Sequence, residues 1–138
     1  MLEIFDKSRK RIAIAENAYD IVEDQKINAL WYLSFSLPFD DSKNAYCKPF
    51  NYVRCDGGEL YRIMPSAVSI TETGGITYQC EHVLATLLDN VLFGYHVVGN
   101  LGVYTADCIR YVLDHQLTKH WVLDVCEFAR QFEYGWEQ

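Results

Sequence analysis

Apolar and polar residues alternate with a period of two along much of the first 80 positions, a pattern that predicts strands. The clearest example is the strand expected at residues 29–37. Its two faces differ, with Trp31, Leu33, Phe35 and Leu37 on one and Tyr32, Ser34 and Ser36 on the other. One face therefore meets a core, and the other meets solvent or a partner. Pro38 ends this strand, because proline has no backbone N–H to give to a ladder.

Turn residues between such strands predict two hairpins. Residues 2–15 form the first hairpin, which has a polar tip. Residues 50–55 and 59–64 form the second, around the turn Asp56-Gly57-Gly58. Because each hairpin is a local structure, both are expected to pair antiparallel.

The remaining elements of this half extend the same pattern. Pro65 marks a break or a bulge, and residues 67–72 and 76–80 then continue an antiparallel meander. A further short strand is expected at residues 20–22. Residues 40–48 are polar and are expected to contain one helical turn.

The period changes after residue 80. A short helix is expected there, with one apolar stripe made of Val83, Leu84, Leu87 and Leu88. A second helix is expected at residues 106–116, with Thr105 as its N-cap and Asp107 in its first turn. This helix is expected to bury Ile109, Val112 and Leu113. Strands or extended segments are expected at residues 91–98, 121–128 and 129–138.

Many strands, two short helices and no regular alternation of strand and helix define the expected fold. The fold class is α+β, mainly antiparallel β, built on an antiparallel sheet or barrel. The 10 Tyr, 7 Phe and 3 Trp agree with this, because aromatic residues favour half-buried pleated surfaces. At 138 residues, the chain has room for one domain, or for one domain and the start of another.

Charge narrows the classes of partner. The 12 Lys and Arg against 19 Asp and Glu leave a net charge of −7, which argues against a broad nucleic-acid-binding face. The basic cluster at residues 7–11 is interpreted as a solvated hairpin tip. No apolar run approaches the roughly 20 residues of a membrane-spanning helix, so no membrane span is expected. No signal peptide is expected either, which favours a reducing compartment.

The five cysteines are Cys47, Cys55, Cys80, Cys108 and Cys126. Their number is odd, their spacing is irregular and no pair forms a C-x-x-C motif. Each is therefore interpreted as a small apolar residue rather than as half of a disulfide.

One candidate metal site lies near the second helix. His115 and His120, with Asp114 and Asp124 close in sequence, are possible ligands. Their spacing matches no familiar zinc motif. The alternative is a helix C-terminus, where His115, Lys119 and His120 lie near exposed carbonyl groups. No metal and no cofactor is expected.

A candidate nucleophile lies in the segment Cys80-Glu81-His82. In a strand, Cys80 and His82 share a face and Glu81 points to the other. No oxyanion hole and no third orienting group is evident beside them. The alternative is a junction between strand and helix in which Cys80 belongs to the core. No catalytic residue is assigned, and the residues alone indicate a β-rich domain without a visible reaction centre.

Several segments, taken in order, resemble the N-terminal region of phage minor structural proteins of the tail-associated lysin family. They are LEIFD at residues 2–6, YLSFSLP at 32–38, YVR at 52–54, GELYRI at 58–63, YQCEHVLATLLDN at 78–90, TADCIRYVL at 105–113 and FEYGWE at 132–137. These proteins form the tail-tip hub of long-tailed phages and prophages, and they are similar to the central baseplate hub protein of contractile-tailed phages.

The resemblance implies an architecture and a set of partners. Residues 1–90 would start a β-barrel-like tube domain, and residues 91–138 would begin an inserted α/β portion. Each subunit of a homotrimer would contribute two tube domains to a ring that continues the tail tube. The distal tail protein and the tape measure protein would be neighbours, at the virion tail tip and, during assembly, in the cytoplasm of the bacterial host. Any lytic activity of the family would lie C-terminal to this chain, which is not itself expected to be an enzyme.

Two hypotheses of different classes remain open. The first is a structural hub component, whose acidic lumen would repel DNA and prevent it from sticking. The second is a small enzyme or ligand-binding β-barrel that uses Cys80 and His82, or His115 and His120.

Overall fold

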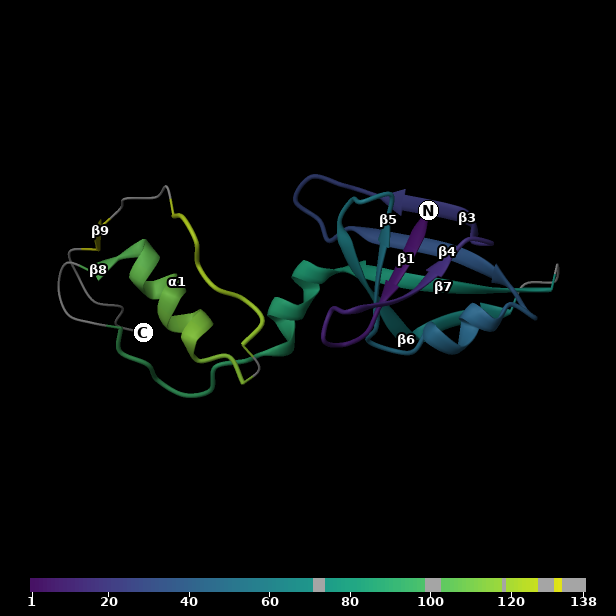
Figure 1. Cartoon of the computed structure of the whole chain (residues 1–138). Coiled ribbons are helices and arrows are strands. Elements are labelled where there is room, and N and C mark those ends of the chain that lie inside the picture. Colours follow the sequence, from purple (N-terminus) through teal and green to yellow (C-terminus); the bar gives the residue numbers. More distant parts are fainter. Residues whose placement is uncertain (71–73, 99–102, 118, 127–130, 133–138) are drawn as a thin grey trace. The chain divides into compact units, whose positions relative to one another are not determined.

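The computed structural model describes residues 1–70, 74–98, 103–117, 119–126 and 131–132, and it divides the chain into two compact units (Figure 1). Unit 1 is Met1–Ala85 and unit 2 is Thr86–Gln138. Within the described ranges, no helix is both long enough and apolar enough to cross a membrane.

A seven-stranded sheet forms most of unit 1. Its strands are β1 (Leu2–Phe5), β2 (Arg11–Ala15), β3 (Tyr19–Asp24), β4 (Tyr32–Pro38), β5 (Tyr52–Cys55), β6 (Leu60–Ile70) and β7 (Gly75–His82). They are ordered β2-β1-β5-β6-β7-β4-β3, and every neighbouring pair is antiparallel. The expected fold class, α+β with mainly antiparallel β structure, is confirmed.

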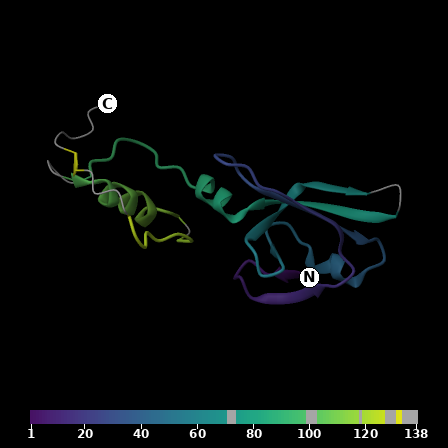
Figure 2. The same cartoon turned by 90° about the horizontal axis from the view of Figure 1, so that it is seen from above.

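Sheet order and chain order differ in one informative way. The β1–β2 hairpin lies at one end of the sheet, and the β3–β4 hairpin lies at the other. The meander β5-β6-β7 follows both hairpins in sequence but lies between them in the sheet (Figures 1 and 2). Unit 1 is therefore two early hairpins joined by a later three-stranded meander.

The sheet is open, so the expected barrel is not closed. In the part of the chain that the structure describes, β2 and β3 each pair with one neighbour only. The 3₁₀ helix η1 (Ser42–Tyr46) lies beside β2. Its N-cap is Asp41, whose side chain accepts a 2.8 Å hydrogen bond from the Lys43 N–H.

One face of the sheet forms the core. Leu33, Phe35 and Leu37 of β4 are fully buried, which confirms the predicted period-two stripe, whereas Trp31 precedes the strand and packs at the margin of the core. The Phe35 and Tyr78 rings stack with centroids 5.2 Å apart. Other core residues come from the remaining strands and from the end of η1, namely Leu2, Ile4, Ala15, Cys47, Val53, Tyr61, Ile63 and Cys80.

The hydroxyl group of Tyr78 fixes η1 to the sheet. It donates a 2.8 Å hydrogen bond to Oδ1 of Asn44, and the Asn44 amide donates to the carbonyl oxygen of Pro38 at 2.8 Å. Burial raises the pKa of Tyr78 to about 12, so the phenol stays protonated and remains a donor. The helical turn predicted within residues 40–48 is thus confirmed and has a defined anchor.

Both predicted hairpins are present. In the first, the Asp6 carboxylate closes the tip by accepting backbone hydrogen bonds from Ser8 at 2.9 Å and Lys10 at 3.0 Å. In the second, β5 pairs with β6 from Tyr52 opposite Arg62. The predicted irregularity at Pro65 is also confirmed, because the β6–β7 register shifts between Ile63 and Val68.

The described residues of unit 2 hold few helices and strands. Its described elements are β8 (Val103–Tyr104), α1 (Thr105–Asp114) and β9 (Gln131–Phe132), and the 3₁₀ helix η2 (Val83–Asp89) leads into it from β7. Strands β8 and β9 pair antiparallel. The helix predicted at residues 106–116 is confirmed as α1, but its N-cap is Tyr104 rather than Thr105, and the Tyr104 N–H donates to Asp107 at 3.3 Å.

Several expectations for the second half are wrong. The short helix expected at Val83 to Leu88 is present as the 3₁₀ helix η2, whereas residues 91–98 and 121–126 form no strand. Residues 127–128, and all of 129–138 except the strand β9, lie outside the described residues. Ile109 and Val112 of α1, expected to be buried, are 37% and 50% exposed. In the described residues of this half, the alternation of apolar and polar residues therefore does not indicate strands.

Candidate functional site

Cys80 lies in the core rather than at a reactive surface. It is fully buried on β7, where it faces Leu33 of β4 on one side and Ile63 of β6 on the other. Burial raises the pKa of its thiol far above the ordinary value. Because the thiolate is the nucleophile and this group stays a thiol, the position favours packing over catalysis.

His82 shares the buried face of β7 with Cys80 but has its own partners. Its Nδ1 accepts a 3.2 Å hydrogen bond from the Leu84 N–H, and its Nε2 lies 3.4 Å from Oε2 of Glu59. Its ring makes edge contacts with Trp31 and Tyr61, with centroids 5.5 and 5.4 Å apart. Both ring nitrogens are thus occupied at the end of the sheet, which fits an anchoring role for His82.

The histidines near α1 form a ring cluster rather than a ligand set. His115 Nδ1 lies 2.8 Å from the Tyr111 carbonyl oxygen, and the centroids of the two rings are 4.0 Å apart. His96, which the sequence did not single out, approaches the same tyrosine, with Nδ1 3.0 Å from its hydroxyl oxygen. His120 is exposed. Among the described residues, no group of three His, Cys, Asp or Glu could hold a metal ion.

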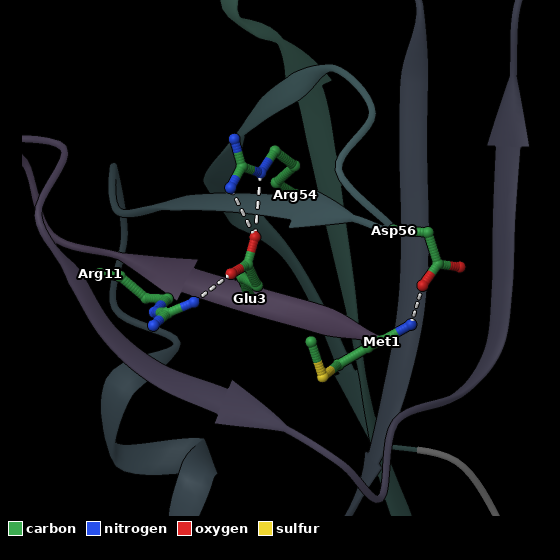
Figure 3. Close-up of polar contacts among 5 residues, drawn as sticks. All are labelled: Met1, Glu3, Arg11, Arg54 and Asp56. Carbon is green, nitrogen blue, oxygen red and sulfur yellow. Dashed lines mark hydrogen bonds and ion pairs between the residues drawn. The ribbon is translucent and has the colours of Figure 1, made fainter.

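The sequence did not reveal an ionic network on the outer face of the sheet. Glu3 of β1 lies between Arg11 of β2 and Arg54 of β5 (Figure 3). Its Oε1 accepts from Arg11 Nη1 at 2.6 Å, and its Oε2 accepts from Arg54 Nη2 at 2.7 Å and Nε at 3.0 Å. These two partners lower the pKa of Glu3, Arg11 contributing more than Arg54. The network links three neighbouring strands, and Figure 3 also shows the Met1 amino group beside Asp56.

A second ion pair lies further along the same face. Arg62 of β6 faces Glu81 of β7, and Nε of Arg62 donates to Oε1 of Glu81 at 2.9 Å. Both side chains are largely buried. The ring of Phe50 lies 5.6 Å from the Arg62 guanidinium and covers it.

Phe50 has an unusual backbone. The turn from Lys48 to Asn51 is closed by a 3.1 Å hydrogen bond from the Asn51 N–H to the Lys48 carbonyl oxygen, with Pro49 and Phe50 as its central residues. Phe50 has φ +66°, a left-handed value that favours glycine or asparagine at this turn position. This conformation costs an aromatic residue about 1–2 kcal/mol of backbone strain. Strained residues of this kind are often found at functional sites, so Phe50 is a candidate binding residue.

An open groove runs beside this turn. A concavity of about 780 Å³ is lined by the hairpin tip, by η1 and by the turn, and includes Lys7, Ile12, Tyr46, Lys48 and Phe50. A smaller concavity of about 390 Å³ adjoins it at Ile12 and lies between Arg11 and Ile14 of β2 and Lys43 of η1. Together these concavities are called the β2–η1 groove. Its rim carries Lys7, Lys43 and Lys48 together with Asp6 and Glu16, and an apolar floor with such a mixed rim is suited to binding rather than to a chemical step.

Comparison with known proteins gives two matches. Residues 2–82 match the sequence model of the family described as the prophage endopeptidase tail N-terminal domain. The fold is similar to the crystal structure of prophage tail protein gp18 from Listeria monocytogenes EGD-e, with a TM-score of 0.65, 12% sequence identity and 83% of this chain covered. The match covers 33% of the Listeria chain. No curated protein gave a significant match.

Proposed function

Because the chain belongs to the family of the prophage endopeptidase tail N-terminal domain, and so carries the N-terminal region of a phage tail protein, we propose that it is a structural part of the tail tip. In this proposal the protein forms a homo-oligomeric ring, a trimer for the full-length product, that continues the tail tube as a hub. Its neighbours are the distal tail protein and the tape measure protein. It resides at the virion tail tip after assembly in the host cytoplasm.

The open sheet is the observation that carries this proposal. Strands β2 and β3 present backbone N–H and C=O groups that no other strand within the described residues pairs. Unpaired edges are a liability in a monomer, and assemblies use such edges for contacts between subunits. Because β2 and β3 are different surfaces, a contact between them is head-to-tail, and contacts of that type close into rings when the rotation allows.

We propose that the endopeptidase named in the family's description belongs to a region outside residues 2–82. The support is chemical. In this part of the chain, the thiol of Cys80 is buried and protonated, and both nitrogens of His82 are occupied. A nucleophile needs exposure and a thiolate or an adjacent base. The net charge of −7 further suits a ring whose lumen repels DNA phosphate instead of binding it.

Deleting the gene from a phage or an inducible prophage that carries it tests the proposal. We expect induced lysates to contain no tails, or tails without an organised tip, and a plasmid copy to restore them. Antibody-gold labelling of an epitope-tagged copy in electron micrographs should mark the tip. Intact, infectious tails from the deletion strain, or label along the shaft or on the head, would contradict the proposal.

A further inference from the structure

A buried histidine, His82, lies where the chain leaves the sheet of unit 1. It is the last residue of β7, and the 3₁₀ helix η2 begins at the next position. Its backbone N–H donates to the Trp31 carbonyl oxygen at 2.8 Å, so the main chain at His82 is still tied to the sheet. The residue is only 7% exposed. A change in its charge therefore acts directly on the junction between β7 and η2.

The hydrogen bonds of His82 define which ring nitrogen carries the proton. A backbone N–H can only donate, so Nδ1, which lies 3.2 Å from the Leu84 nitrogen, is the acceptor and is unprotonated. The proton of the neutral ring is therefore on Nε2, which lies 3.4 Å from Oε2 of Glu59. A second proton has Nδ1 as its only site on the ring.

Two aromatic rings hold the imidazole of His82 in this orientation. The Trp31 and Tyr61 rings meet it edge to face, with centroids 5.5 and 5.4 Å away and interplanar angles of 66° and 85°. Burial is the main cause that raises the pKa of Tyr61 to about 12, so its phenol stays neutral where histidine titrates. Because the ring is packed on both sides, a proton added at Nδ1 stays directed at the Leu84 N–H.

The charges around His82 act in opposite directions. Two carboxylates face the ring, Glu59 directly and Glu23 of β3 beyond Tyr61. Trp31 and Leu84, which also contact the ring, carry no charge, and Arg62 and Glu81 pair with each other on the opposite face of the sheet. The carboxylates favour the charged ring, whereas the Leu84 N–H favours the neutral ring.

We propose that His82 is a pH-sensitive contact between the sheet and η2. The neutral ring accepts from the Leu84 N–H and holds the first turn of η2. In the protonated ring, Nδ1–H faces the Leu84 N–H, so two donors meet, this hydrogen bond is lost and the ring keeps its contact with Glu59. Mild acid thus releases the start of η2 while β7 stays paired. This inference goes beyond the proposed tail-tip function and does not rest on it.

Nitrogen-15 NMR of the full chain between pH 8 and pH 5 tests the proposal. At pH 8, the ring-nitrogen shifts of His82 should show a bare Nδ1 and a protonated Nε2. As the ring takes up its second proton, the hydrogen-exchange protection of the Leu84 amide, relative to an unstructured peptide at the same pH, should fall by roughly fivefold or more. The His82 amide, which donates to Trp31, should keep its protection.

Three variants separate His82 from other titrating groups. His82→Asn supplies a carboxamide oxygen in place of Nδ1, an acceptor that does not titrate, so Leu84 protection should not depend on pH. Glu59→Gln removes a carboxylate that favours the charged ring, and the midpoint of the change should move to lower pH. The Glu59 side chain is 59% exposed, so this variant should fold. His120→Asn changes an exposed histidine in unit 2 and is the matched control that should behave as wild type.

Several results overturn the inference. One is a His82 ring that carries its proton on Nδ1 at pH 8, or that remains neutral down to pH 5. Another is Leu84 protection that stays constant while His82 titrates. A third is the same pH dependence in a folded His82→Asn variant, which would assign the effect to another group. If His82→Asn did not fold, Glu59→Gln would decide, because an unchanged midpoint there would contradict the role of His82.

Discussion

Tyr19 and Gly75 form a contact that depends on the absence of a side chain. A Cβ placed on Gly75 would lie 1.8 Å from the Tyr19 hydroxyl oxygen and 3.1 Å from its Cζ. Tyr19 opens β3 and Gly75 opens β7, with β4 between them. The Tyr19 side chain thus reaches across β4 and fastens the edge strand to the interior of the sheet.

Gly75→Ala should displace the Tyr19 ring and destabilise unit 1 by about 1–3 kcal/mol, the usual cost of overpacking. Urea unfolding followed by fluorescence measures this change. Because the hydroxyl oxygen makes the closest approach, Tyr19→Phe should recover part of the loss in the double variant. If Gly75→Ala cost the same in the wild-type chain and in the Tyr19→Phe variant, the contact would be contradicted.

Phe50→Gly should be more stable than Phe50→Ala by about 1 kcal/mol, because only glycine adopts φ +66° without strain. Urea unfolding of the two variants gives the difference. The same pair of substitutions at Tyr32, an exposed strand residue, is the control. There the order should reverse, since glycine is unfavourable in a strand. If the alanine variant were the more stable one at both positions, backbone strain at Phe50 would be contradicted.

The thiols should differ sharply in reactivity. Burial raises the pKa of Cys47 to about 12 and raises that of Cys80 further, so both remain protonated at pH 8. Alkylation by iodoacetamide, followed by peptide mass spectrometry, should be slower at these two by roughly a hundredfold or more than at Cys108. The difference should vanish in urea. Rapid labelling of Cys80 in the native protein would contradict this prediction and would make Cys80 a candidate nucleophile again.

Glu3 should make stability depend on acid pH. Arg11 and then Arg54 lower its folded-state pKa below the ordinary 4.5. Its contribution is therefore complete above pH 4.5 and is lost as the pH falls through the lower folded value. Thermal unfolding from pH 3 to pH 7 should show this loss. Glu3→Gln should lower the Tm at pH 7 and flatten the acid slope, whereas an unchanged slope would show that Asp6 and Asp41, whose pKa values are also lowered, dominate.

The first half of the fold was predictable because its patterns are local. The hairpin tip at Asp6, the turn at Asp56-Gly57 and the break at Pro65 act within a few residues, and the structure confirms each. The resemblance to a phage tail protein is also confirmed by the family match over residues 2–82. The pairing of β1 with β5 was not predicted, because register between distant strands is decided by packing rather than by either strand alone.

The candidate site was less predictable, for two physical reasons. The sequence indicated Cys80 and His82 as candidate catalytic residues. Their reactivity depends on how deeply they are buried, which the alternation of apolar and polar residues does not reveal. Phe50 looked like an ordinary strand residue, since nothing in its neighbours predicts a positive φ for an aromatic side chain. In the second half, residues 91–98 and 121–126 alternate without forming strands, because alternation needs a partner edge to become a sheet.

The nested strand order has a consequence for synthesis. On the ribosome, the two hairpins emerge first, yet each shows its remaining edge to water until residues 52–82 follow. A nascent chain stalled before Gly75 would hold the four-stranded piece β2-β1-β5-β6 and, unconnected to it, the β3–β4 hairpin. Strand β7 is the last strand of the seven-stranded sheet to be translated, and it is the one that joins the two parts, so the polypeptide must leave the exit tunnel almost to His82 before this sheet can be complete.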